Sequence, residues 1–447
     1  MKKTLFAVGL FAASLAASAQ TAQKWTLQQC IDYAVAHNIQ IQKNYASVRS
    51  AQVDLLEAKA ARQVTLNASA AEQVQYRPFQ ESASNFVNGG LASSSSSKVG
   101  ESGSYGINAS WTLWDGQRTK YNIQNAQLAQ DIAETASAIT ANSLQEQIAQ
   151  LYIQILYTQE AYKVDEELLK QDQQLYERGQ EFVNQGKMSR ADLSELEAQV
   201  STASYNLVNV QTQIDNYKFQ LKQLLELDPT QDIDVADVSV TDAQVMAAIP
   251  DRATVYEKAL LSRPEIRQNE LTIQQNELAT KIAKTNRMPT VSLTGSVGDS
   301  HMTGSQNNFF NQMKQNLNAV VGVSISIPIL DNRKTKSAIE RAQVNELTAQ
   351  LDLQDTQKTI WKSVESYWVN AVNNQAKYKA AKVNVSSSQT SYDLLSEQFT
   401  VGLKNISDLL QSRSKLLSAK QTMLEDKYNA LYNLALLNFY AGEKITF

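Results

Sequence analysis

Apolar and polar residues alternate with a period of two in four stretches of the chain. This period places successive side chains on opposite faces, so each stretch predicts a strand with one apolar face. Ten of the fifteen glycines fall at positions 89–116 and 295–322, where turns between strands need flexible residues. The alternation therefore predicts two strand pairs, one within residues 64–114 and one within residues 289–330.

The remaining pattern predicts very long helices that associate as coiled coils. Residues 117–178 and 333–401 contain no glycine or proline. At about 1.5 Å per residue, such helices reach roughly 90 to 100 Å. The return segments 187–228 and 403–441 follow them, and the first return segment carries an unbroken heptad seam of apolar residues. The seam residues are Leu193, Leu196, Val200, Ala203, Leu207, Val210, Ile214, Tyr217, Leu221 and Leu224.

One strand-to-helix junction occurs twice in the chain. It is written "SWTLWDGQRTK" from Ser110 and "SIPILDNRKTK" from Ser326, 216 residues later. Further upstream the matching offset is 225, so the first copy holds a variable loop that is nine residues longer. We predict a first repeat at residues 20–229, a linker at 230–250 and a second repeat at 251–447. Each repeat would contain a helix, a strand pair, a long helix and a return helix.

Each junction contains an aspartate followed by basic residues. Asp115 and Asp331 are placed to cap the free N–H groups at the start of the long helices. Basic side chains are unfavourable beside the positive end of a helix dipole. A membrane interface explains them, because Lys and Arg reach anionic headgroups and Trp favours the same depth. The candidates are Trp111, Trp114, Arg118, Lys120, Arg333 and Lys334. The alternative is a soluble corner with exposed charges.

Composition and the first residues narrow the class of protein. A net charge of −4 and a pI near 5.5 give no broad basic surface, so no nucleic-acid partner is expected. Residues 1–19 have a basic start, an apolar run and small residues at the end, which predicts a secretory signal peptide. The single cysteine, Cys30, excludes an internal disulfide and is expected to be an inert apolar position. Beyond the signal, no run of about 18 apolar residues predicts a transmembrane helix.

Four alternating strands in an exported chain favour a membrane β-barrel. One chain cannot close a barrel, because an open sheet leaves backbone N–H and C=O groups at its edges that find no hydrogen-bond partner in lipid. Three chains would give twelve strands, and their long helices would form a ring of coiled coils. We therefore predict a mainly α fold with a small β part, made of duplicated coiled-coil hairpins plus four transmembrane strands per chain. The homotrimer would form a 12-stranded β-barrel continued by an α-barrel.

Three motifs and the duplicated order of elements resemble the TolC-like outer-membrane efflux protein family. The motifs are "MPTVSLTGSVG" at 288–298, "VSISIPILDNRK" at 323–334 and "FTVGLKNISDLL" at 399–410. The resemblance covers nearly the whole mature chain. It implies a passive channel-tunnel in the outer membrane of a Gram-negative bacterium, with a large periplasmic portion, for drug efflux or polypeptide secretion. It also implies a periplasmic adapter protein and an inner-membrane transporter as partners. The alternatives are a structural or adhesive coiled-coil protein and, less favoured, an enzyme.

The resemblance directs attention to the hairpin tips, "NQGKMSRADL" and "TVGLKNISDL". It implies that the adapter docks at the tips and that acidic residues ring the periplasmic entrance. The docking candidates are Gly186, Gly402, Ser189 and Asp192, and the gate candidates are Asp408, Lys404 and Gln411. In the family a second acid commonly occupies the position of Gln411, which leaves the cation affinity of the ring open. The alternative for both aspartates is helix capping, because Ser189 and Asn405 precede them by three residues.

The chain offers little to support catalysis. His37 and His301 are the only histidines, and neither has the sequence spacing of a metal site or a catalytic triad. Phosphate-binding glycine motifs are absent, so no cofactor, metal or catalytic residue is expected. The acidic run at 165–167 is expected on a solvated helix face.

Overall fold

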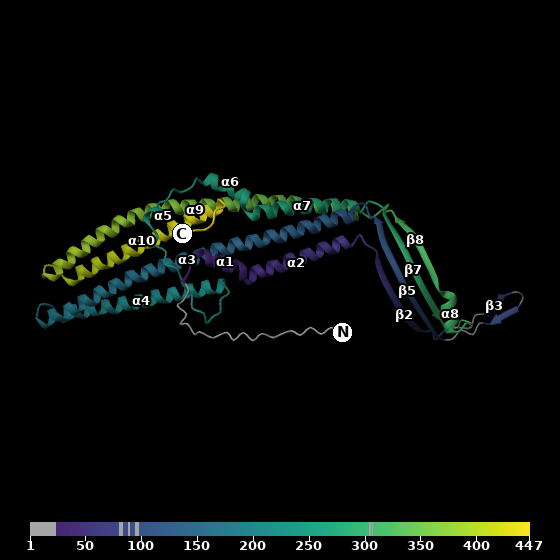
Figure 1. Cartoon of the computed structure of the whole chain (residues 1–447), viewed down its shortest axis with the longest axis horizontal. Helices are drawn as coiled ribbons and strands as arrows, with labels where there is room; N and C mark the ends of the chain where they lie inside the picture. Colours follow the sequence, from purple (N-terminus) through teal and green to yellow (C-terminus); the bar gives the residue numbers. More distant parts are fainter. Residues whose placement is uncertain (1–23, 80–83, 88–89, 94–97, 304, 306) are drawn as a thin grey trace, which may run out of the picture. The chain divides into compact units, whose positions relative to one another are not determined.

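The computed structural model describes residues 24–79, 84–87, 90–93, 98–303, 305 and 307–447 (Figure 1). The predicted signal peptide lies outside these residues. The chain divides into two compact units. We call them the helical unit (Met1–Lys43, Ser137–Pro264 and Gln357–Phe447) and the strand unit (Asn44–Ala136 and Glu265–Thr356). The prediction of a mainly helical fold with a small β part is confirmed.

The strand unit is built on one antiparallel sheet with the strand order β2-β5-β7-β8. Its strands are β2 (Thr65–Tyr76), β5 (Val99–Trp114), β7 (Thr290–Met302) and β8 (Asn318–Ser326). The two strand pairs of the duplicated sequence thus meet through β5 and β7. The strands β2 and β8 form the edges of this sheet.

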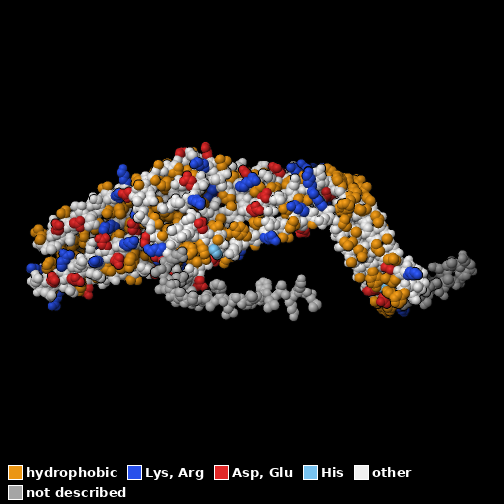
Figure 2. Space-filling view, in the orientation of Figure 1, with side chains coloured by type: hydrophobic (Ala, Val, Ile, Leu, Met, Phe, Trp, Pro, Cys, Tyr) orange, Lys and Arg blue, Asp and Glu red, His pale blue; other side chains and the backbone are white. Residues whose placement is uncertain are grey.

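The register of the sheet separates an apolar face from a polar face. Residues that oppose one another across antiparallel strands project from the same face. One row across all four strands consists of Leu66, Ala109, Gly295 and Val321. The next row, on the opposite face, consists of Asn67, Asn108, Ser296 and Val320. Leu66 and Val321 are 68% and 79% exposed, so the apolar face is uncovered. Figure 2 shows hydrophobic side chains along these strands.

Both copies of the junction turn from strand to helix in the same way. Gly116 and Gln117 have positive φ angles in the first copy, and Asn332 and Arg333 have them in the second. The two long helices, α3 (Arg118–Asn184) and α9 (Lys334–Thr400), then run for 67 residues each. The N–H groups of Thr119 and Thr335 each donate at 2.8 Å to the preceding aspartate, Asp115 and Asp331 respectively. The predicted caps are therefore confirmed.

Two further helices and a short one complete the strand unit. They are α2 (Ile39–Ala60), α7 (Pro264–Thr285) and α8 (Phe309–Asn316). The connection between β7 and β8 contains α8, which Asn308 caps by accepting the N–H of Asn311. The connection between β2 and β5 spans residues 77–98, because β5 begins at Val99. The short strands β3 (Ser84–Val87) and β4 (Gly90–Ser93) pair within it.

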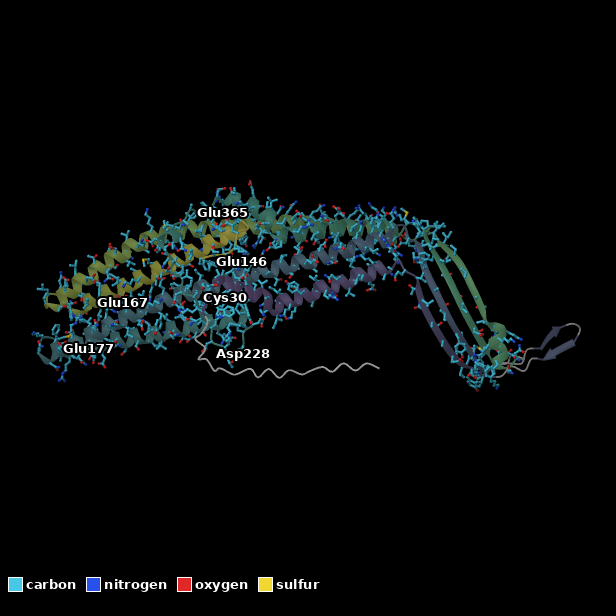
Figure 3. All side chains as sticks on the ribbon, viewed as in Figure 1. Cys30, Glu146, Glu167, Glu177, Asp228 and Glu365 are labelled. Carbon is cyan, nitrogen blue, oxygen red and sulfur yellow. The ribbon has the colours of Figure 1, made fainter. Side chains whose placement is uncertain are left out.

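The helical unit contains the C-terminal parts of α3 (from Ser137) and α9 (from Gln357). It also contains their return helices α4 (Arg190–Leu224) and α10 (Ile406–Tyr440). Every position of the predicted seam on α4 is buried or half-buried, which confirms the coiled-coil interpretation. The short helices α1 (Leu27–His37) and α6 (Arg252–Ser262) also lie in this unit. Cys30 on α1 (Figure 3) is fully buried, and burial raises the pKa of its thiol to about 12. It is the inert position expected.

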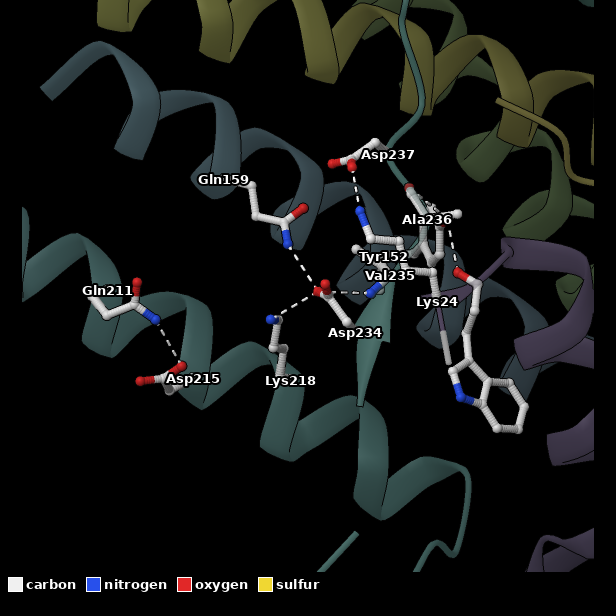
Figure 4. Close-up of polar contacts among 11 residues, drawn as sticks. Lys24, Tyr152, Gln159, Gln211, Asp215, Lys218, Asp234, Val235, Ala236 and Asp237 are labelled. Atoms are coloured by element: carbon white, nitrogen blue, oxygen red, sulfur yellow. Dashed lines mark hydrogen bonds and ion pairs between the residues drawn. The ribbon is translucent and has the colours of Figure 1, made fainter. Parts of the chain in front are cut away.

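The linker expected at 230–250 is more ordered than its sequence suggests. Its strand β6 (Asp234–Val235) pairs in parallel with β1 (Lys24–Trp25), and α5 (Asp242–Val245) follows. Figure 4 shows how polar contacts fasten it. Lys24 Nζ lies 2.5 Å from Asp237, and Asp234 receives Lys218 Nζ from α4 at 2.9 Å and Gln159 from α3 at 3.3 Å. The linker therefore holds α3 and α4 together.

No helix among the residues that the structure describes combines the length and the apolar composition that a bilayer crossing requires.

Candidate functional site at the hairpin tips

Glycine reverses the chain at both hairpin tips. Gly186 and Gly402 have φ angles of 70° and 78°. At the first tip, Gly186 N–H donates to Val183 and Lys187 N–H donates to Phe182, at 3.0 and 2.8 Å. The second tip repeats both bonds after α9, at 2.9 Å each. This is the Schellman arrangement, which needs a left-handed residue after the helix and so favours glycine.

The return helices start with side-chain caps. Ser189 Oγ accepts the N–H of Asp192 at 3.1 Å, and Asn405 Oδ1 accepts the N–H of Asp408 at 2.8 Å. The capping oxygens therefore come from Ser189 and Asn405, while the aspartates supply the backbone N–H. The negative side chains of Asp192 and Asp408 stand in the first turn, where the helix dipole favours them.

The two tips contact each other through a small apolar cluster. Its buried members are Leu175, Leu196, Ile406 and Leu409. Met188 and Phe399 pack against the cluster from the two turns. A hollow of about 810 Å³ lies beside it and is lined by residues of both tips, including Gly186, Asp192, Gly402 and Lys404. The structure thus gathers the predicted docking residues around one concave surface.

The gate candidates lie in the first two turns of α10 and just before it. Lys404 Nζ lies 3.4 Å from Asp408 Oδ2, and both side chains are nearly half exposed, at 45% and 40%. An ion pair this exposed contributes little to stability, because solvent screens it. Gln411 is exposed one turn beyond Asp408. The carboxylate is therefore accessible to ions that approach the tip.

A set of charged contacts that was not predicted from the sequence lies deeper between the hairpins. Arg413 on α10 forms a bidentate ion pair with Asp172 on α3. Lys427 Nζ lies 3.2 Å from Glu160 Oε1 on the same two helices. Each pair joins one repeat to the other. The sequence does carry a signal for such contacts, namely a charged residue at an apolar heptad position. Arg413, for example, stands seven residues after Ile406.

The expectation of a solvated face at 165–167 is wrong for its first residue. Asp165 is only 5% exposed, and its Oδ1 accepts a 3.4 Å hydrogen bond from Gln421 on α10. Its Oδ2 is buried and has no hydrogen-bond partner among the described residues. Burial raises the pKa of this carboxyl, and the hydrogen bond from Gln421 opposes the effect. Glu166 and Glu167 (Glu167 is labelled in Figure 3) are exposed as expected.

The residues proposed for a membrane interface lie in the strand unit and are all exposed. They are Trp111, Trp114, Arg118, Lys120, Arg333 and Lys334. Trp111 Nε1 donates to the Arg62 carbonyl at 2.9 Å, which fixes the ring beside the end of α2. A guanidinium nitrogen of Arg333 lies 3.1 Å from Glu340 Oε2, and both side chains are exposed. Hydrogen bonds from Thr335 hold the pKa of Asp331 below its usual value, so this cap stays ionised.

These features define a class of protein that combines duplicated coiled-coil hairpins with a four-stranded sheet whose apolar face is uncovered. Residues 30–226 and 255–443 match the family described as outer membrane efflux protein. The chain belongs to this family, which is a family of transport proteins rather than enzymes.

The chain is similar to several members with known names. It is 28% identical to the outer membrane protein TolC of Escherichia coli over 274 residues, which are 58% of this chain and 53% of TolC. It is 25% identical to the alkaline protease secretion protein AprF of Pseudomonas aeruginosa over 303 residues, 66% of this chain and 62% of AprF. The chain therefore spans just over half the length of the curated relatives it matches first.

The fold is shared with solved outer membrane proteins. VceC from Vibrio cholerae superimposes with a TM-score of 0.76 at 16% identity, covering 94% of this chain and 97% of VceC. At this identity the likeness shows the fold alone.

Proposed function

We propose that this chain is the outer-membrane channel-tunnel of a tripartite efflux or type I secretion system. It would conduct substrates passively from the periplasm, or from an inner-membrane transporter, to the exterior. The observation that carries the proposal is the sheet β2-β5-β7-β8, with one uncovered apolar face and two edge strands, in a chain that also has two long hairpins. An apolar face of this kind suits lipid, and its edges require further strands.

A homotrimer meets that requirement. Pairing β8 of one chain with β2 of the next would join three four-stranded sheets into a closed barrel of twelve strands. The exposed residues Trp111, Trp114, Arg118, Lys120, Arg333 and Lys334 would then lie at the periplasmic membrane interface. The loops around 77–103 and 300–316 would face the exterior. A reporter epitope inserted near Ser95, which lies outside the described residues, should be labelled on intact cells.

The hairpin tips would carry the regulated end of the tunnel. The hollow between the turns at Gly186 and Gly402 offers a concave surface to a periplasmic adapter protein. Ser189 and Asp192 stand on one side of it. In a trimer, three copies of Asp408 with Lys404 would converge at the mouth, and Gln411 would supply no second charge.

The test is reconstitution of the purified protein in planar bilayers, alongside unheated gel electrophoresis. A channel predicts stepwise conductance and a detergent-resistant trimer that dissociates on heating. A structural or adhesive coiled-coil protein, the alternative, predicts trimers without conductance. A monomer released from cells without detergent would contradict both the barrel and the membrane location.

A further inference from the structure

A row of three residues at the far end of the sheet gathers side chains that bind metals. Glu72 on β2 pairs with Gly103 on β5, and Gly103 pairs with His301 on β7. Residues in one row project from the same face, so Glu72 and His301 lie on either side of Gly103. Glu101 precedes Gly103 by two residues and therefore projects from this face as well. Three strands thus bring two carboxylates and an imidazole together.

Gly103 is the residue that permits this approach. A Cβ at this position would lie 2.3 Å from His301 Cε1 and 2.4 Å from Glu72 Oε1. The two neighbouring side chains therefore close over the space that a side chain would occupy. His301 Nε2 comes to 3.6 Å from Glu72 Oε2 across the glycine.

The ligand atoms are close enough to share one ion. In the part of the chain that the structure describes, one atom each of Glu72, Glu101 and His301 all lie within 4.8 Å of one another. Ligands of a tetrahedral zinc ion stand roughly 3.3 Å apart, as follows from bonds of about 2.0–2.1 Å. A bound zinc ion would therefore draw the three atoms closer together than they stand here.

Neighbouring residues hold the three ligands in place. The hydroxyl of Tyr105 donates to Glu72 Oε1. Thr303 fixes the backbone of Glu101, whose N–H donates to Thr303 Oγ1 at 2.6 Å while its carbonyl accepts the Thr303 N–H at 2.7 Å. The side chain of His301 is 13% exposed, and its Nδ1 is buried without a hydrogen-bond partner among the described residues. Buried polar atoms are normally hydrogen-bonded, and a bound ion would use this free capacity of the imidazole.

We propose that Glu72, Glu101 and His301 form a binding site for a divalent first-row transition ion, with Zn²⁺ as the best fit. The imidazole selects against Ca²⁺ and Mg²⁺, which prefer all-oxygen sites. The ion would cancel the repulsion between the two carboxylates and tie β2, β5 and β7 together. Glu72 and Glu101 are exposed, so an ion and a water ligand can reach the cluster from solvent. This proposal does not depend on the channel function.

The test is calorimetric titration of Zn²⁺ into chelator-treated protein, folded in detergent and purified without a histidine tag. We expect one ion per chain. Glu72→Gln, Glu101→Gln and His301→Gln should each weaken binding by at least about 10-fold, and Gly103→Ala should do so because its Cβ displaces two ligands. The matched control is His37→Gln, which removes the only other histidine and lies in the helical unit. It should leave the affinity unchanged.

A second readout reports the ligands directly. Co²⁺ should give a visible absorption band that His301→Gln abolishes, with far-UV circular dichroism confirming that the variant is folded. Three outcomes would overturn the proposal: no saturable Zn²⁺ binding, equal weakening by His37→Gln, or displacement of Zn²⁺ by an equal concentration of Ca²⁺. The first outcome would leave the cluster a hydrogen-bonded group without a metal, the second would place the ion elsewhere, and the third would show a site without preference for a transition ion.

Discussion

Arg413 on α10 and Asp172 on α3 form an ion pair that is almost completely removed from solvent. Their side chains are 5% and 2% exposed, and Arg413 Nε donates to Asp172 Oδ1 at 2.5 Å. Burial raises the pKa of Asp172, and the neighbouring guanidinium opposes this effect. Because each ion loses its hydration, such a pair adds less stability than its geometry suggests. Removing only one of the two charged side chains, however, leaves the other as an uncompensated buried charge.

The first prediction follows from this asymmetry. Arg413→Ala should destabilise the protein by about 3–5 kcal/mol, because Asp172 would remain buried without its partner. Replacing both residues, with Asp172→Leu and Arg413→Met, should restore most of the stability. Thermal unfolding followed by circular dichroism at pH 7.5 measures both. If the double variant were as unstable as Arg413→Ala, the loss would come from packing and not from the unpaired charge.

The second prediction concerns Asp165 and pH. Its folded-state pKa lies above the unfolded value, so the folded protein binds the proton more tightly. The contribution of this group is therefore favourable at low pH and is lost as the pH rises through the folded pKa. Asp165→Asn keeps the acceptor for Gln421 and removes the buried charge. At pH 8 it should stabilise the protein by about 1 kcal/mol.

The measurement for Asp165 is the unfolding temperature between pH 4 and pH 8. The gain from Asp165→Asn should shrink toward pH 4, because protonation increasingly neutralises the wild-type carboxyl as the pH falls. Glu167→Gln is the matched control, because Glu167 is exposed two residues away and should show no such trend. A variant that is less stable than the wild type at pH 8 would show that Asp165 is needed as an anion.

The third prediction concerns the turn at Gly402. A Cβ there would meet no atom within 4 Å, so the positive φ angle of 78° is the only obstacle to a larger residue. Gly402→Ala should therefore cost about 1–2 kcal/mol, and Gly402→Asn less, because Asn tolerates the left-handed region. Gly179→Ala should lower the stability for a different reason: its Cβ would lie 2.7 Å from Leu196 Cδ1, so the Leu196 side chain would have to move. Equal losses for Ala and Asn at Gly402 would exclude backbone strain as the cause.

Periodicity predicted the elements of this fold well, because each pattern reflects one local geometry. The alternation that ends near Trp114 and the seam from Leu193 to Leu224 follow from which face of a strand or helix is buried. The contact between Arg413 and Asp172 could not be predicted in this way, since it depends on how two distant hairpins pack. The same holds for His301, whose ligand partners come from two other strands and are set by register. Heptad spacing marks Arg413 as a charge at an apolar position, but local spacing does not identify Asp172 or the partners of His301.

The fourth prediction tests the apolar face of the sheet. Val323 and Ser324 are neighbours on β8 and project from opposite faces. Val323→Arg should destabilise the folded protein in a bilayer by about 2–4 kcal/mol if this face contacts lipid near the membrane centre. Ser324→Arg should be tolerated. The measurement is the yield of heat-modifiable trimer after folding into liposomes, and equal tolerance of both charges would argue against a lipid-facing sheet.

The last prediction concerns the gate. Closing a trimer at the hairpin tips brings three Asp408 carboxylates together, and they repel one another unless cations, protons or Lys404 compensate. Asp408→Ala should therefore reduce the block of single-channel conductance by multivalent cations added from the periplasmic side. The helix should survive this change, because the cap oxygen belongs to Asn405 and the Asp408 N–H is retained.

Two further variants separate the ring from helix capping. Gln411→Asp should strengthen the block, because it adds a second acid one helical turn beyond Asp408. Asp192→Ala, at the matching position of the other tip, should affect the block less. Raising the salt concentration should weaken the block in the wild type, since screening reduces the field of the ring. If Asp408→Ala leaves the block unchanged in an intact trimer, the aspartate serves the first turn of α10 alone, and cations bind elsewhere in the tunnel.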